Sequence, residues 1–161
     1  MSKRFAIVGA MAMALALPGA AGAQSNLLRD WGSSDMRQAL TAAGAKINSE
    51  TQLESGAPYF NAETDQGLKF IVYGTVCKGE TVKRCAGANL VADFSYDSDA
   101  AVDAREKKID RAAVGVRNAG GNTLEVSRYV IFDEGITAGN LRENVLVFIE
   151  VVHDIWNGGG D

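Results

Sequence analysis

The sequence predicts an α+β fold in which helices pack on an antiparallel sheet, and three observations carry this prediction. The chain contains five candidate strands, and two of them, residues 68–76 and 89–96, place alternate residues on opposite faces with a period of two, as half-buried strands do. Short turns rich in Gly, Asp and Asn join neighbouring runs, and such turns connect antiparallel strands. Three segments with helical patterning accompany the runs, so the expected element order is α-β-β-β-α-β-β-α.

An apolar segment precedes all of these elements. Two basic residues near the start are followed by apolar residues 5–17, a Pro-Gly break and small residues at 21–23. This pattern is typical of a secretory signal peptide, here over residues 1–23, with cleavage expected after Ala23. A membrane anchor is the alternative, but the run is shorter than a bilayer-spanning helix requires.

The chain that remains after cleavage is acidic. It keeps 14 basic against 20 acidic residues, a formal charge of −6, and its length suits one domain. An acidic chain without a basic stripe argues against nucleic acid and against anionic membranes as partners. We therefore expect a soluble periplasmic or secreted domain over residues 24–157, with no membrane insertion after signal removal and a flexible tail over 158–161.

The first elements follow from caps and turns. Residues 24–32 are expected to be a polar lead-in that contains Trp31. Ser33 or Ser34 can cap a helix over residues 35–45, because a hydroxyl accepts from the first free backbone N–H groups of a helix. A loop is expected between this helix and the first strand.

Two cysteines flank the turn of the predicted hairpin. The first three strands are expected over residues 59–64, 68–76 and 89–96. Cys77 and Cys85 lie between the second and third strands, and in an oxidising compartment such a pair most simply forms a disulfide. Val76 shares the core face of its strand, whereas Cys77 falls in the outward register, so the bridge is expected off the core face. A redox-active pair is the alternative, but the C-x-x-C spacing is missing.

The second half of the chain continues the pattern. A helix is expected over residues 97–110, capped by Asp97 or Ser98, and two strands over 111–118 and 123–132. Gly120 and Gly121 are expected to form the turn between these strands, because glycine adopts a positive φ without strain. Gly135 is expected to serve a later turn in the same way.

The closing helix is expected from Ala138 to Trp156, with Thr137 as its cap. Its apolar arc should cover the sheet, with Trp156 at one margin. The arc comprises Leu141, Val145, Phe148, Ile149, Val151, Val152, Ile155 and Trp156. Leu146 falls on the wetter face and Val147 at its border. These two residues are the candidate contact with a partner protein or with a second copy in a homodimer. The alternative is that Leu146 is a single exposed leucine without a function, as is common on monomeric proteins.

Three stretches of the chain resemble the YbjN-like family, whose members are described as bacterial sensory transduction regulators. They are the cysteine-flanked strand pair "GLKFIVYGTVC...C...NLVADFSY", the strand and turn "LEVSRYVIFDEGIT", and the closing segment "GITAGNLRENVLVFIEVVHDIW". The resemblance implies a small non-enzymatic domain with a type III secretion chaperone-like fold.

A search for chemistry finds little. His153 is the one histidine, and no nucleophile motif accompanies it. Asp99, Asp103, Glu106 and Asp110 form a carboxylate stripe on the second helix. The stripe suits a divalent cation or a polycationic ligand, but a solvated helix face, with Lys107 supporting Asp103 one turn away, is the favoured interpretation. We expect no catalytic residue, no cofactor and no metal ligand set, since two cysteines and one histidine do not complete a zinc site.

The function predicted from these features is an exported, non-enzymatic binding or chaperone-like module of the bacterial envelope, with a protein as the expected partner. The alternative is a periplasmic inhibitor or accessory subunit that docks on an envelope enzyme through its acidic surface. An exposed apolar patch would favour the first function, and an exposed acidic ridge would favour the second.

Overall fold

The computed structural model describes residues 27–109 and 113–158, and in this part of the chain six strands form one antiparallel sheet with three helices. The elements are α1 (Ser33–Ala42), β1 (Lys46–Gln52), β2 (Pro58–Glu63), β3 (Lys69–Lys78), β4 (Arg84–Ser95), α2 (Asp99–Glu106), β5 (Gly115–Gly120), β6 (Thr123–Ile131) and α3 (Ala138–Trp156). The strand order is β1-β2-β3-β4-β6-β5. The predicted signal peptide and most of the predicted tail lie outside the described residues.

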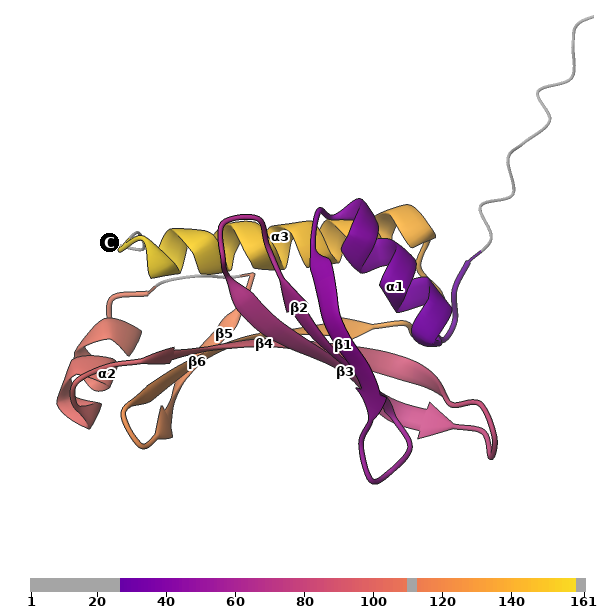
Figure 1. Cartoon of the computed structure of the whole chain (residues 1–161), viewed down its shortest axis with the longest axis horizontal. Helices are drawn as coiled ribbons and strands as arrows, with labels where there is room; N and C mark the ends of the chain where they lie inside the picture. The colour runs from indigo at the N-terminus through magenta and orange to yellow at the C-terminus, as the bar shows by residue number, and fades with distance from the viewer. Residues whose placement is uncertain (1–26, 110–112, 159–161) are drawn as a thin grey trace, which may run out of the picture.

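The two longer helices lie on the same face of the sheet (Figure 1). The core forms between this face and α3, and it includes Phe60, Val72 and Leu90 from the strands. Phe70 meets Phe148 of α3 edge-on, with ring centroids 5.6 Å apart. The predicted apolar arc of α3 is confirmed at its centre, but Trp156 is 47% exposed, so its place in the core was wrong.

The predicted α+β class is confirmed, and the predicted element order lacks one strand. β1 pairs with β2 along the edge of the sheet, where a loop was expected. Its side chains are almost all polar, and Ile47 alone packs against the core. An edge strand of this composition shows no apolar alternation, because it buries very little of either face.

The helix starts agree with the predicted caps except at α1. Thr137 Oγ1 accepts from the N–H of Asn140 at α3, and Ser98 Oγ accepts from the N–H of Ala101 at α2. At α1 the cap is Gly32 instead of Ser33 or Ser34. The N–H of Gly32 donates to Asp35 Oδ2, 2.9 Å away. The predicted turn glycines are confirmed, since Gly120, Gly121 and Gly135 all have positive φ.

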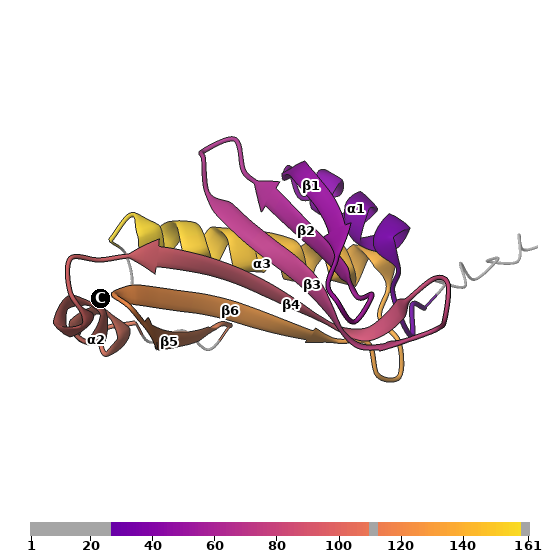
Figure 2. The ribbon, with the colours of Figure 1, turned by 60° about the horizontal axis from the view of Figure 1, so that its bottom comes forward.

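The sheet opens between its two central strands. β3 and β4 lie together near their hairpin and fan apart toward the other end, where α3 lies behind the opening (Figure 2). Within the described residues, no helix is long and apolar enough to cross a membrane.

Candidate functional site

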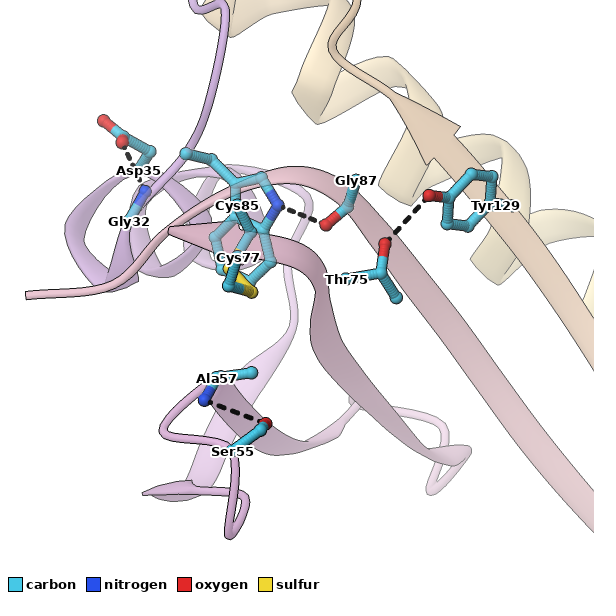
Figure 3. Close-up of a disulfide and its surroundings, with 10 residues drawn as sticks. Gly32, Asp35, Ser55, Ala57, Thr75, Cys77, Cys85, Gly87 and Tyr129 are labelled. Atoms are coloured by element: carbon cyan, nitrogen blue, oxygen red, sulfur yellow. Dashed lines mark hydrogen bonds between the residues drawn. A yellow bond between two sulfur atoms is a disulfide. The ribbon is translucent and has the colours of Figure 1, made fainter. Parts of the chain in front are cut away.

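Cys77 and Cys85 form the predicted disulfide at the hairpin end of β3 and β4 (Figure 3). The expectation that it lies off the core face was wrong, because Cys85 is fully buried and belongs to the core. The sulfurs lie directly over Gly74 on the buried side of β3. A Cβ atom at Gly74 would approach Cys85 Sγ to 2.4 Å and Cys77 Sγ to 2.9 Å. Only a glycine leaves room for the bridge there.

Val76 explains why the bridge changes sides. Its φ is +50°, which is rare for a β-branched residue, and its side chain is 64% exposed. The alternation of β3 therefore ends at Gly74. Val76 leaves the core face on which it was predicted, and Cys77 turns toward the core, where it packs partly buried.

Trp31 belongs to the core, not to a polar lead-in. Its main chain exchanges two hydrogen bonds with Cys85, of 3.0 and 2.8 Å. Its indole N–H donates to the Gly87 carbonyl oxygen, and its ring packs near Phe60 and Phe132, with both centroids 6.5 Å away. The residues before α1 thus pack against the disulfide-linked end of the hairpin.

The face of the sheet opposite the helices carries an apolar patch beside the disulfide. The patch consists of Val76, Tyr129 and Ile131, all exposed, around a hollow of about 320 Å³. Thr75 Oγ1 donates to the Tyr129 hydroxyl at 2.9 Å, and Gly87 leaves the space that the phenol ring occupies (Figure 3). Hydrogen bonding thus holds Tyr129 in place on an otherwise water-exposed surface.

The carboxylate stripe of α2 holds the β5–β6 hairpin. Asp99 Oδ1 accepts from the N–H of Asn122, while Asp103 and Glu106 both accept from Asn118. Among the described residues, no group of three or more potential ligands could hold a metal ion. Asp110 lies outside the described residues. Three of the four carboxylates therefore have a structural role that the stripe pattern alone did not reveal.

The remaining predicted residues lie along α3. His153 is half-buried, its Nε2 lies 3.0 Å from Thr64 Oγ1, and its ring stacks on Trp156 at 5.7 Å. Leu146 and Val147 are both half-buried. Neither of them belongs to the core cluster or to the strongly exposed apolar residues.

The opening between β3 and β4 forms a cleft. The two strands pair from Lys78–Arg84 to Ile71–Val91, although β3 begins at Lys69 and β4 runs to Ser95. A cleft of about 540 Å³ occupies the opening, within the range of small-ligand sites. Its walls are the start of β3, the end of β4 and the last residue of α3. Lys69, Asp93, Ser95, Tyr96 and Trp156 all line it.

Asp93 is a partly buried carboxylate with a second carboxylate, Glu125, nearby. Partial burial raises the pKa of its carboxyl group above the ordinary value, and repulsion by Glu125 raises this pKa further. Arg117 lowers the pKa of Asp93 only in part, since its Nε and one terminal nitrogen both donate hydrogen bonds to Glu125. Asp93 makes no ion pair with a described residue. The cleft thus combines exposed aromatic surface with a carboxylate that forms no ion pair with the part of the chain that the structure describes.

Sequence reasoning did not find this cleft. Asp93, Phe94 and Ser95 fit the alternation of an ordinary central strand, and periodicity does not report where a ladder ends. The one usable signal was Trp156, a large aromatic residue at the margin of the predicted arc.

The comparisons with known proteins leave function open. No family model and no curated protein matches the chain. A crystal structure of an uncharacterized protein from Methanothermobacter thermautotrophicus is similar, at 15% identity and with a TM-score of 0.49. The similarity covers 79% of this chain and 98% of that one.

Proposed function

We propose that the protein is an exported, non-enzymatic binding module of the bacterial envelope with a chaperone-like or regulatory role, and that the cleft between β3 and β4 is its binding site. One observation carries the proposal: the central ladder ends at Ile71–Val91 while both strands continue beside an exposed Trp156. A large aromatic side chain held in the wall of a cleft offers apolar contact area at little entropic cost.

Two features support a binding module rather than an inhibitor or accessory subunit that docks through an acidic surface. Val76, Tyr129 and Ile131 form an exposed apolar patch, which is the surface expected of a protein-binding module. The carboxylates of α2, in contrast, accept hydrogen bonds from the β5–β6 hairpin. The YbjN-like family and the type III secretion chaperone-like fold remain part of the proposal, supported by the sequence resemblance and by the helix that closes the sheet.

Site-specific photo-crosslinking in cells tests the site. A photoreactive amino acid would replace Ser95 in the cleft or, as a matched control, the exposed Thr51 of edge strand β1. We expect discrete adducts from position 95 and none of the same mass from position 51. Absence of adducts from position 95, or identical adducts from both positions, would contradict the cleft as the binding site.

Export is tested separately by the intact mass of the secreted protein. The signal pattern predicts a chain that begins at Gln24. A chain that still begins at Met1 in the envelope fraction would contradict export by cleavage.

Leu146 and Val147 remain the proposed contact with a partner or a second copy. The substitution Leu146→Asp should reduce self-association in sedimentation experiments while changing thermal stability little. A sharp fall in stability, or unchanged association, would remove this contact from the proposal.

A further inference from the structure

Main-chain groups at the splayed ends of β3 and β4 identify the kind of ligand that the cleft fits. Just beyond β4, the N–H of Tyr96 donates to the Asn122 carbonyl at 2.9 Å. Near its other end, the Ala86 carbonyl accepts from Phe132, also at 2.9 Å. The register between β4 and β6 is unbroken from Gly87 to Ser95. Even-numbered residues of β4 in this stretch therefore direct their main-chain groups toward β6, because direction alternates along an antiparallel ladder.

Odd-numbered residues of β4 consequently direct their N–H and C=O groups toward β3. For Asn89 and Val91 the ladder supplies partners on β3. For Asp93 and Ser95 it does not, although both lie within β4. The same reasoning applies to Lys69. The N–H of Thr64 donates to the Leu68 carbonyl, so even positions of β3 face β2 and Lys69 faces the cleft.

We propose that the cleft binds a short extended peptide segment whose main chain pairs with Lys69, Asp93 and Ser95, with a basic side chain against Asp93 on the outer face of the sheet and the next side chain against Trp156 on the helix face. This inference rests on the proposed function, because it names the ligand of the same cleft. Exposed strand edges bind peptides by adding a strand, which supplies main-chain hydrogen bonds that are independent of sequence.

The shape of the opening limits the length of the segment. The Ile71–Val91 pair closes one end of the cleft, and the other end opens beyond Ser95. Four residues of β4 follow Val91, which corresponds to roughly 13 Å at about 3.3 Å per residue. The cleft therefore accommodates about four extended residues, with one end of the segment near the Ile71–Val91 pair.

Side chains at the cleft favour a basic residue in the segment. Asp93 forms no ion pair among the described residues, and Arg117 donates two hydrogen bonds to Glu125. Trp156 and Tyr96 present aromatic surface on the helix side of the cleft. Successive side chains of an extended segment point to opposite faces, so the residue next to the basic one would pack against this surface. The side chain of Asp93 lies on the outer face, because Ala92 and Phe94 pack into the core, and a cation beside it would offset its repulsion by Glu125.

The test uses isotope-labelled protein of residues 24–161 and a pool of pentapeptides with acetylated and amidated ends. Each peptide has a central Lys and varied Val, Thr, Ser or Phe at the other positions. A second pool carries a central Glu, and a third keeps Lys but has N-methylated main-chain amides. We expect the first pool to shift the NMR resonances of Lys69, Asp93 and Ser95 and to slow exchange of the Asp93 and Ser95 amides. The Glu and N-methyl pools should bind about tenfold more weakly.

Two variants assign the side-chain contacts. Asp93→Asn and Trp156→Ala should each weaken the Lys pool about tenfold, whereas Asp65→Asn, an exposed carboxylate outside this cleft, should not. Equal binding of the N-methyl pool would overturn the strand-addition mode, and absent binding of the Lys pool would overturn the peptide class. If crosslinks from position 95 persist while every pool fails, the ligand is a different molecule and only this inference fails. If both fail, the proposed function fails with it.

Discussion

The indole N–H of Trp31 donates to the carbonyl oxygen of Gly87 at 2.9 Å and so joins the segment before α1 to the disulfide-linked end of β4. Both residues are buried. The contact closes the covered face of the sheet at the disulfide end, while the opposite end of the same two central strands stands open.

Trp31→Phe should lower the free energy of unfolding by about 1–3 kcal/mol, because the buried Gly87 carbonyl loses its donor while a ring remains in place. Urea denaturation of the oxidised protein measures the change. The matched control is Trp156→Phe on an exposed side chain, expected to stay within about 0.5 kcal/mol. Equal effects of the two substitutions would show that the hydrogen bond contributes nothing.

Gly74→Ala should be destabilising by about 1–3 kcal/mol, because its Cβ would lie 2.4 Å from Cys85 Sγ. The Cys77→Ala/Cys85→Ala variant has no sulfur atoms at this site, so Gly74→Ala should lower its free energy of unfolding clearly less. A double-mutant cycle measured by urea denaturation gives this coupling. Additive effects would place the disulfide away from Gly74.

The sequence correctly predicted the strands whose side chains alternate between two faces and the helices that begin at a capping residue. It did not predict the features that depend on how the strands pair. α3 was predicted to the residue, because Thr137 and the apolar arc both mark it. β1 was missed because its side chains are polar on both faces. The turn of Cys77 toward the core follows from the positive φ of Val76, and a β-branched residue gives no sequence sign of that conformation.

The candidate site was less predictable than the fold. The cysteines signalled their own bridge, but the opening between β3 and β4 depends on where a ladder ends, a property of two strands together. The apolar patch likewise joins Val76 of β3 to Tyr129 and Ile131 of β6. The stripe on α2 was visible, but its bonds to Asn118 and Asn122 required the position of the hairpin.

Asp93→Asn should stabilise the protein at neutral pH. The pKa of Asp93 is raised in the folded state, so folded protein holds more protons than unfolded protein between about 3.9 and the folded pKa. The free energy of unfolding of the wild type therefore falls as pH rises through this window, and the variant lacks that loss. Urea midpoints from acid to neutral pH should show an advantage of the variant that disappears below about pH 4.

High salt should shrink that advantage, because it screens the repulsion between Asp93 and Glu125. An Asp93→Asn variant that is less stable than wild type at neutral pH would contradict the assigned electrostatics.

The double substitution Asp103→Ala/Glu106→Ala should lower stability by about 1–2 kcal/mol, because both anchors of Asn118 are lost. Thermal unfolding measures this, with Glu80→Ala in the exposed hairpin loop as the control for a lost negative charge. Added Ca²⁺ should leave the melting temperature of the wild type unchanged. A calcium-dependent rise would instead assign the stripe to a cation.

Amide hydrogen exchange of the free protein tests the central claim, that β3 and β4 present unpaired main-chain groups to the cleft. Ala92 and Phe94 face β6, and Asn89 and Val91 lie within the β3–β4 ladder, so all four amides should exchange slowly. The amides of Asp93 and Ser95 should exchange much faster, although they lie in the same strand. Protection of Asp93 and Ser95 equal to that of Val91 would show that the opening is closed in solution, and would contradict the cleft as a binding site.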